Sequence, residues 1–171
     1  NEAGGVIDDT IFYRLAEDRY LLIPNAGNRV TVVAWFQRWI DERFIGGCDI
    51  DDQTRETGLI AVQGQDSPRI LEGLCQMDNG EPLSTVRPFT WAGGKFQGNA
   101  VFLGRTGYTG EDGFEVYLPV SESGRFWNAF LDAGKPVGLI PCGLGARNTL
   151  RLEAGMLLYG HDMNEDVTPL E

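Results

Sequence analysis

Apolar residues along the first quarter of the chain recur with two different periods. In residues 6–15 and 19–24, apolar and polar positions alternate loosely and β-branched and aromatic residues are frequent, which predicts the two strands of a β-hairpin. In residues 28–44, apolar side chains recur at the spacing of one α-helical face, through Val33, Phe36, Ile40 and Phe44. The following Gly46-Gly47 is typical of a helix end.

The rest of the chain alternates between predicted strands and helices. Thr57–Gln63 predicts a short buried strand, and Ser67-Pro68 begins a helix because proline is favoured at the first helical position. The apolar face of this helix would carry Ile70, Leu71, Leu74 and Cys75. Further strands are expected in residues 84–91, 100–106 and 113–119, with a connector at Gly93-Gly94, and further helices in residues 121–134 and 144–154.

The order and spacing of these elements indicate the fold class. Many successive strands lie too close together along the chain for the helical crossovers that parallel strands need. We therefore expect an α+β fold, with a mainly antiparallel sheet and packed helices. A length of 171 residues, 42% of them hydrophobic, is enough for about one domain with its own core and excludes intrinsic disorder.

Charge and composition exclude several kinds of partner and site. Lys and Arg number 14 against 25 Asp and Glu, a net charge of −11, so nucleic acid is not an expected partner. No apolar run is long enough to cross a membrane and no signal peptide is recognisable, so a soluble protein is expected. Three dispersed cysteines and a single histidine predict neither a disulfide framework nor a metal site. The cysteine usage favours a reducing compartment.

Two adjacent carboxylates, Asp8 and Asp9, lie at the start of the first predicted strand. Neighbouring side chains of a strand face opposite sides, so one of the two could point into a pocket and the other into solvent. Such an inward carboxylate orients an amine-bearing ligand or takes a proton from it. A polar strand end without any function remains the alternative.

A glycine-rich segment joins two predicted strands at residues 105–115. It lacks the lysine of a phosphate-binding loop and carries acids that would repel phosphate. It can instead present Tyr108 as a flat surface beside Glu115, whose two oxygens suit a planar ring with an amino group and a ring N–H. The alternative is a tortuous turn without a ligand.

Two arginines, Arg147 and Arg151, are four residues apart and share one face of the last predicted helix. Either arginine suits a carboxylate ligand, because a guanidinium can donate two parallel hydrogen bonds. The alternative is a structural ion pair, with Glu153 or with an acid of the sheet.

Four sequence blocks, taken together, carry a resemblance to a known family. They are NEAGGVIDD at residues 1–9, LIAVQG at 59–64, RTGYTGEDGFE at 105–115, and GLGARNTLRLEAG at 143–155 followed by LYG at 158–160. Their order and separation resemble the T-protein of the glycine cleavage system, a tetrahydrofolate-dependent aminomethyltransferase. The resemblance covers essentially all of this chain.

The resemblance implies three domains around a channel that binds folate and admits the lipoyl arm of H-protein. It implies transfer of an aminomethyl carbon from the lipoyl sulfur to tetrahydrofolate, with release of ammonia and formation of methylenetetrahydrofolate. Tetrahydrofolate is the co-substrate and no metal is needed. We expect residues 1–171 to be a central fragment, without the N-terminal segment and the C-terminal β-barrel domain of the family. The expected location is the bacterial cytoplasm, or the mitochondrial matrix in a eukaryote.

Site residues follow from the same resemblance. It implies that Asp9 is the catalytic acid beside the folate nitrogens and that Glu115 recognises the pterin edge. Other folate-pocket positions fall on Tyr108, Arg147, Ile11, Tyr13 and Asn25. Asn148 stands where the family usually has Asp, which removes a charge beside Arg147 and leaves the exact one-carbon donor open.

Two related functions remain as alternatives. One is a folate-dependent demethylase module of the dimethylglycine or sarcosine type, which takes its carbon from a different donor. The other is a non-catalytic folate-binding protein, whose relatives carry a cysteine-containing K-G-C-Y-x-G-Q-E-type motif that this sequence lacks.

Overall fold

The computed structural model describes residues 1–170, which form two compact units. The first unit consists of Asn1–Asp52 together with the segment that begins at Leu157. The second unit consists of Gln53–Met156. No helix in the described residues is long and apolar enough to cross a lipid bilayer.

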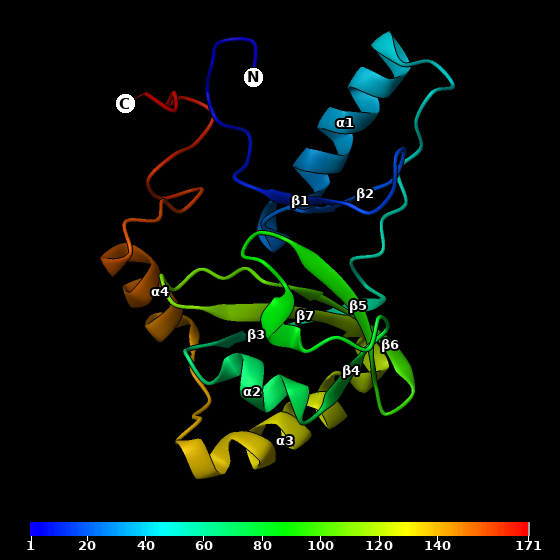
Figure 1. Cartoon of the computed structure of the whole chain (residues 1–171). Coiled ribbons are helices and arrows are strands. Elements are labelled where there is room, and N and C mark those ends of the chain that lie inside the picture. The colour runs from blue at the N-terminus through cyan, green and yellow to red at the C-terminus, as the bar shows by residue number, and fades with distance from the viewer. Residues whose placement is uncertain (171) are drawn as a thin grey trace. The chain divides into compact units, whose positions relative to one another are not determined.

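The second unit contains a five-stranded sheet, drawn in Figure 1. Its strands are β3 (Thr57–Gln63), β4 (Cys75–Met77), β5 (Trp91–Phe96), β6 (Asn99–Gly104) and β7 (Gly113–Pro119). They pair in the order β3-β7-β6-β5-β4, and every pair is antiparallel. The expected α+β fold with an antiparallel sheet is therefore confirmed.

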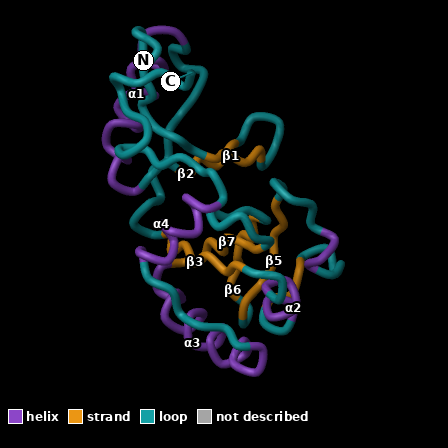
Figure 2. Tube along the Cα trace, turned by 90° about the vertical axis from the view of Figure 1, so that its left-hand side faces the viewer, coloured by secondary structure: helices purple, strands orange, loops and turns teal. Residues whose placement is uncertain are grey.

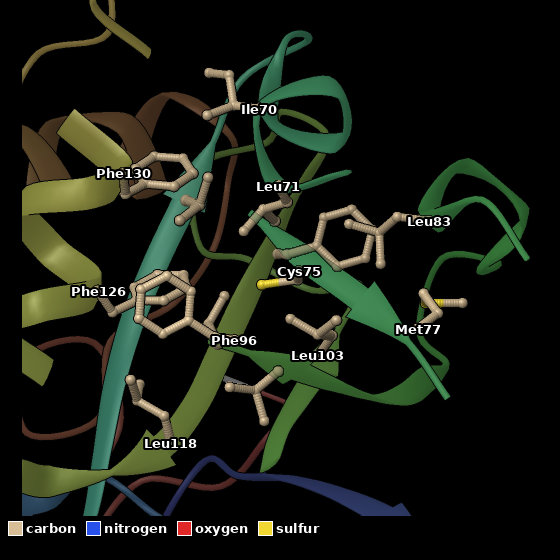
Figure 3. Packing of buried hydrophobic residues seen from close by; sticks show 14 of the residues in the cluster. Ile70, Leu71, Cys75, Met77, Leu83, Phe96, Leu103, Leu118, Phe126 and Phe130 are labelled. Carbon is tan, nitrogen blue, oxygen red and sulfur yellow. The ribbon is translucent and has the colours of Figure 1, made fainter. Parts of the chain in front are cut away.

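One face of this sheet is covered by α2 (Ser67–Glu72) and α3 (Ser123–Gly134), as Figures 1 and 3 show. Strand β7 faces the helices with Phe114, Val116 and Leu118, all of them buried. Successive side chains of a strand point to opposite faces, so Glu115 and Tyr117 lie on the other side of the sheet. The hydrophobic core thus orients the acid singled out in the sequence.

The helices of this unit lie close to their predicted positions. Helix α3 begins at Ser123, after a short 3-10 helix at Val120–Glu122, and it ends at Gly134 as expected. Helix α4 runs over Leu144–Glu153, one residue short of the prediction. Helix α3 has an apolar stripe at the α-helical period, which made it recognisable.

The prediction for Gly93-Gly94 was wrong. These glycines lie inside β5, which begins at Trp91. The expected strand at 84–91 does not form, and a short 3-10 helix at Leu83–Thr85 overlaps its start. A Cβ atom at Gly94 would lie 2.9 Å from the carbonyl oxygen of Gln76 in β4. Glycine is therefore required for the close approach of two strands and does not mark a turn.

The sequence analysis did not predict strand β4. Leu74 and Cys75 were expected on the apolar face of a helix, but α2 ends at Glu72 and Cys75 begins the new strand. The three residues of β4 pair with Phe96, Lys95 and Gly94 of β5. A strand this short shows too little alternation to be recognised.

The first unit contains a two-stranded hairpin and one long helix. Strands β1 (Ile11–Arg14) and β2 (Tyr20–Ile23) are antiparallel and shorter than expected. A 3-10 helix at Ala26–Asn28 leads into α1 (Arg29–Arg43), which confirms the predicted helix. Its predicted apolar face is largely open, however, because Phe36 and Phe44 are 44% and 60% exposed while Val32 is the buried residue.

The two ends of the described chain run side by side in this unit (Figure 2). The Val6 N–H donates hydrogen bonds to the carbonyl oxygens of Asn164, at 2.9 Å, and Val167, at 3.1 Å. The Asn1 side chain donates to the carbonyl of Glu165 at 2.9 Å. The C-terminal segment is thus tied to the residues that lead into Asp8 and Asp9.

The close approach at Gly94 predicts opposite effects for two Gly-to-Ala substitutions. Gly94→Ala should lower the free energy of unfolding by about 1–3 kcal/mol, because the new methyl group meets backbone atoms that cannot move freely. Gly124→Ala, at an exposed position of α3 with open space around it, should raise it by about 0.5–1 kcal/mol. Urea unfolding of both variants measures the difference, and equal effects would contradict the packing argument.

Burial predicts that one thiol is unreactive in the folded protein. Cys75 lies in the core, where burial raises its pKa to about 12, whereas Cys48 and Cys142 are exposed. Because the thiolate is the reactive form, an aromatic disulfide reagent at pH 8 should titrate two thiols quickly and the third only after unfolding. Rapid labelling of all three in the native protein would contradict this placement.

Candidate functional site

The loop between β6 and β7 is closed at its ends by an ion pair. Arg105 donates from Nε to Asp112 Oδ1 at 2.9 Å and from Nη2 to Asp112 Oδ2 at 2.6 Å. The hydrogen bond from Arg105 holds the pKa of Asp112 below its ordinary value. Arg105 Nη1 also donates to the carbonyl of Val86 at 2.6 Å. This two-bond contact fixes where the loop leaves and rejoins the sheet.

A glutamine from β3 crosses the same loop. Gln63 Nε2 donates to the carbonyl oxygen of Thr106 at 3.1 Å, and Gln63 Oε1 accepts from the Thr109 hydroxyl at 2.9 Å. A Cβ atom at Gly107 would overlap this amide, at 1.8 Å from Gln63 Oε1. The glycine at this position therefore makes room for a specific bridge, beyond allowing a bend in the chain.

Helix α4 contributes Arg147 to the loop. Its guanidinium carbon lies 4.4 Å from the centre of the Tyr108 ring, the geometry of a cation–π contact. The structure therefore brings together two of the expected folate-pocket residues. Because the cation lies over the ring, the guanidinium group occupies one face of Tyr108.

Asn148 contacts the second arginine of α4. Asn148 Oδ1 accepts a hydrogen bond from Arg151 Nε at 2.9 Å, and Arg151 Nη1 donates to the carbonyl of Met156 at 3.0 Å. Arg151 is buried. Asn148 thus fixes the end of α4 through Arg151, and these contacts favour the structural interpretation of this second arginine.

Glu115 is half-buried on the sheet face that lies opposite the core helices. Its Oε2 atom accepts hydrogen bonds from the Thr106 hydroxyl at 2.7 Å and from the Tyr117 hydroxyl at 3.3 Å. Within residues 1–170, no protein donor reaches Oε1. Glu115 therefore has one oxygen engaged by the protein and one available to a donor from outside.

In the first unit, Asp8 and Asp9 have different surroundings. Asp8 Oδ2 accepts from the backbone N–H of Asn25 at 3.0 Å, and Asp8 Oδ1 accepts from Asn25 Nδ2 at 2.6 Å. The Asp9 side chain is exposed and accepts no hydrogen bond from any described residue. Partial loss of solvation around the carboxyl group, and then the neighbouring charge of Asp8, raise the pKa of Asp9 above its ordinary value.

This division does not arise from strand alternation as expected. Asp8 and Asp9 both precede β1, which begins at Ile11. Asp8 is instead engaged by Asn25 from the other end of the hairpin, and Asn25 Nδ2 also donates to the Asp9 carbonyl at 3.1 Å. The structure thus brings Asn25 and the acid pair together.

The remaining expected residues of this unit, Ile11 and Tyr13, lie two positions apart in β1 and share one face of the hairpin. Tyr13 is buried and Ile11 is half-buried, while Phe12 between them is exposed. The register pairs Ile11 with Ile23 and Tyr13 with Leu21. The hairpin therefore has a buried face that carries both expected residues.

Sequence reasoning missed the contacts of Gln63, Thr106 and Tyr117. Tyr117 follows Glu115 by two positions in an alternating strand, so their shared face was a recognisable signal. The bridge from Gln63 joins residues more than forty positions apart and had no local signal. Across residues 1–170, no group of three or more His, Cys, Asp or Glu side chains is arranged to hold a metal ion.

The sequence is similar along its length to a known protein family and to individual proteins. The model of the GCVT N-terminal domain family matches residues 1–171. An aminomethyltransferase of Shouchella clausii is 43% identical over 176 residues, which is 99% of this chain and 44% of that protein. An aminomethyltransferase of Bacillus subtilis is 41% identical over 169 residues, or 98% of this chain and 44% of that protein.

A solved structure extends the similarity to the fold. The crystal structure of glycine cleavage system aminomethyltransferase T from Bartonella henselae matches with a TM-score of 0.79 and 36% identity, over 99% of this chain and 42% of that one. The chain thus spans less than half the length of these relatives. Since the family model matches along the entire sequence and the similarity holds in both sequence and fold, the chain belongs to the GCVT N-terminal domain family.

Proposed function

We propose that this chain is the central part of a glycine cleavage aminomethyltransferase. The complete protein would transfer an aminomethyl carbon from the lipoyl arm of H-protein to tetrahydrofolate, with release of ammonia and formation of methylenetetrahydrofolate. The names of the relatives and their greater length support this proposal. In this arrangement an N-terminal segment and a C-terminal β-barrel domain would flank residues 1–171.

The observation that carries the proposal is the difference between the two adjacent acids of the first unit. Asp8 is engaged by Asn25, whereas the Asp9 carboxylate accepts no hydrogen bond from the described residues. Asp9 is therefore available to orient the folate amine. As the carbon–nitrogen bond of the aminomethyl group breaks and ammonia leaves, a nearby carboxylate stabilises the positive charge that develops on the carbon. One folate nitrogen attacks that carbon, the carbon–sulfur bond then breaks to release the lipoyl thiol, and the second folate nitrogen closes the methylene bridge. The two folate N–H protons leave with ammonia and with the thiol, so no covalent protein intermediate is needed.

Glu115 is the proposed acceptor for the pterin edge. A pterin carries an amino group beside a ring N–H, and a carboxylate accepts both kinds of donor. Tyr108 and Arg147, which contact each other, would form another part of the folate pocket. We also propose Ile11, Tyr13 and Asn25 of the first unit as folate-binding residues. Tetrahydrofolate enters as a co-substrate, and the chemistry requires no metal.

The two alternative functions receive no specific support. The curated relatives reported above are named aminomethyltransferases, which favours this activity over a demethylase module or a non-catalytic folate-binding protein. Lipoylated H-protein is accordingly the proposed protein partner. For a bacterial source, we propose the cytoplasm as the location.

Asp9 provides the direct test of the catalytic proposal. In the full-length protein, Asp9→Asn should lower turnover by orders of magnitude while tetrahydrofolate affinity stays nearly unchanged, because the amide keeps the shape but loses the charge. Ammonia release with lipoylated H-protein as donor measures turnover, and calorimetry measures affinity. Asp18→Asn, at an exposed position of the same unit, is the matched control. Undiminished turnover in Asp9→Asn would contradict the role of this acid.

The raised pKa of Asp9 predicts a pH dependence. A carboxylate with a raised pKa takes up its proton at a higher pH than an ordinary aspartate, so the active, charged form is lost earlier on acidification. Turnover should therefore fall on the acidic side at a pH above the ordinary range for aspartate. The Asp9→Asn variant should lack this acidic limb. An identical limb in the variant would assign the titration to another group.

Glu115 is tested by binding. Glu115→Gln in the full-length protein should weaken tetrahydrofolate binding by about 1.5–3 kcal/mol, the usual worth of a hydrogen bond to a charged group. Glu111→Gln provides a control at an exposed glutamate of the neighbouring β6–β7 loop. Calorimetric titration measures both variants, and equal affinities for Glu115→Gln and the wild type would exclude the pterin contact.

A further inference from the structure

Two hydroxyl groups converge on a single oxygen of Glu115. The Thr106 hydroxyl donates to Oε2 at 2.7 Å and the Tyr117 hydroxyl donates to the same atom at 3.3 Å. An ionised carboxylate offers about four acceptor positions, two on each oxygen. The protein thus uses the positions on Oε2, and the described residues leave those on Oε1 available.

Both hydroxyls belong to side chains that are themselves held in place. Thr106 is 8% exposed, and its backbone carbonyl accepts from Gln63 Nε2 at 3.1 Å. The Arg105–Asp112 ion pair fixes the loop that carries it. Thr106 therefore has little freedom to follow a moving glutamate.

An aromatic row holds the second donor. Tyr117 is 5% exposed, and its ring lies edge-on to Phe102, with ring centres 5.4 Å apart and planes at 79°. Phe102 stacks on Trp91, with centres 4.9 Å apart and planes at 18°. Phe102 and Tyr117 are also partners in the β6–β7 register. The tyrosine hydroxyl is therefore anchored through the sheet and not through the loop.

We propose that Thr106 and Tyr117 are positioning residues that hold Glu115 with its Oε1 atom directed to the donors of a pteridine. This inference rests on the proposed function and adds to it how the recognition residue is fixed. A free glutamate side chain loses rotamer entropy when it is ordered. The two hydroxyls already order the Glu115 side chain in the folded protein, so ligand binding does not have to order it.

The inference is tested by removing one hydroxyl without changing the size of the side chain. In the full-length protein, Thr106→Val should weaken tetrahydrofolate binding about 3- to 10-fold in calorimetric titration, whereas Thr106→Ser keeps the hydroxyl and should stay within about twofold of the wild type. Tyr117→Phe should weaken binding over the same range. It provides a second measurement should Thr106→Val not fold. Wild-type affinity in Tyr117→Phe and in a folded Thr106→Val would overturn the inference.

A double-substitution cycle separates positioning from a purely structural role. In a Glu115→Ala background, Thr106→Val should cause no further loss of affinity, because Thr106 acts through the glutamate. An equal loss in both backgrounds would overturn the inference and leave the proposed function standing. Wild-type affinity in Glu115→Ala alone would overturn both. Thermal unfolding of Thr106→Val and Thr106→Ser confirms that folded proteins are compared.

Discussion

The site in the second unit depends on the burial of one face of β7. Phe114, Val116 and Leu118 pack into the core, and the period of a strand then leaves Glu115 and Tyr117 no other direction than the opposite face. A shift of one residue in the register would bury a carboxylate among apolar side chains, at a large cost in free energy. The core therefore determines the orientation of the site, and the loop contacts refine it.

Both candidate acids share one arrangement. The protein forms hydrogen bonds to the neighbouring carboxylate or to one oxygen of the acid, and at least one carboxylate oxygen of the acid stays available to a ligand. In the first unit, Asp8 accepts hydrogen bonds from Asn25, whereas the Asp9 carboxylate accepts none from the described residues. In the second unit, the Thr106 and Tyr117 hydroxyls donate to one oxygen of Glu115 and leave the other oxygen available. A carboxylate whose surroundings are fixed while one of its acceptors stays accessible is the arrangement expected of a preorganised binding site.

Elements with enough residues to show a period could be predicted from the sequence. The alternation of Phe114, Glu115 and Val116 gave the correct face for the acid, and α1, α3 and α4 were found within a few residues. Contacts between distant residues could not be predicted in this way. Gly94 was taken for a turn because its requirement comes from a neighbouring strand, and the bridge from Gln63 to the β6–β7 loop left no local pattern. The roles of Asp9 and Glu115 came from the family resemblance.

The order of the units along the chain has a consequence for folding during synthesis. Residues 1–52 pair with the segment that begins at Leu157, and all of Gln53–Met156 lies between them. The second unit is therefore inserted in the sequence of the first. The first unit cannot complete its hydrogen bonds until the ribosome has released Asn164 and Val167. The whole sequence of the second unit leaves the ribosome before these residues do. If the second unit folds first, the segment between the two halves of the first unit is already compact. The entropic cost of bringing these two halves together is then smaller.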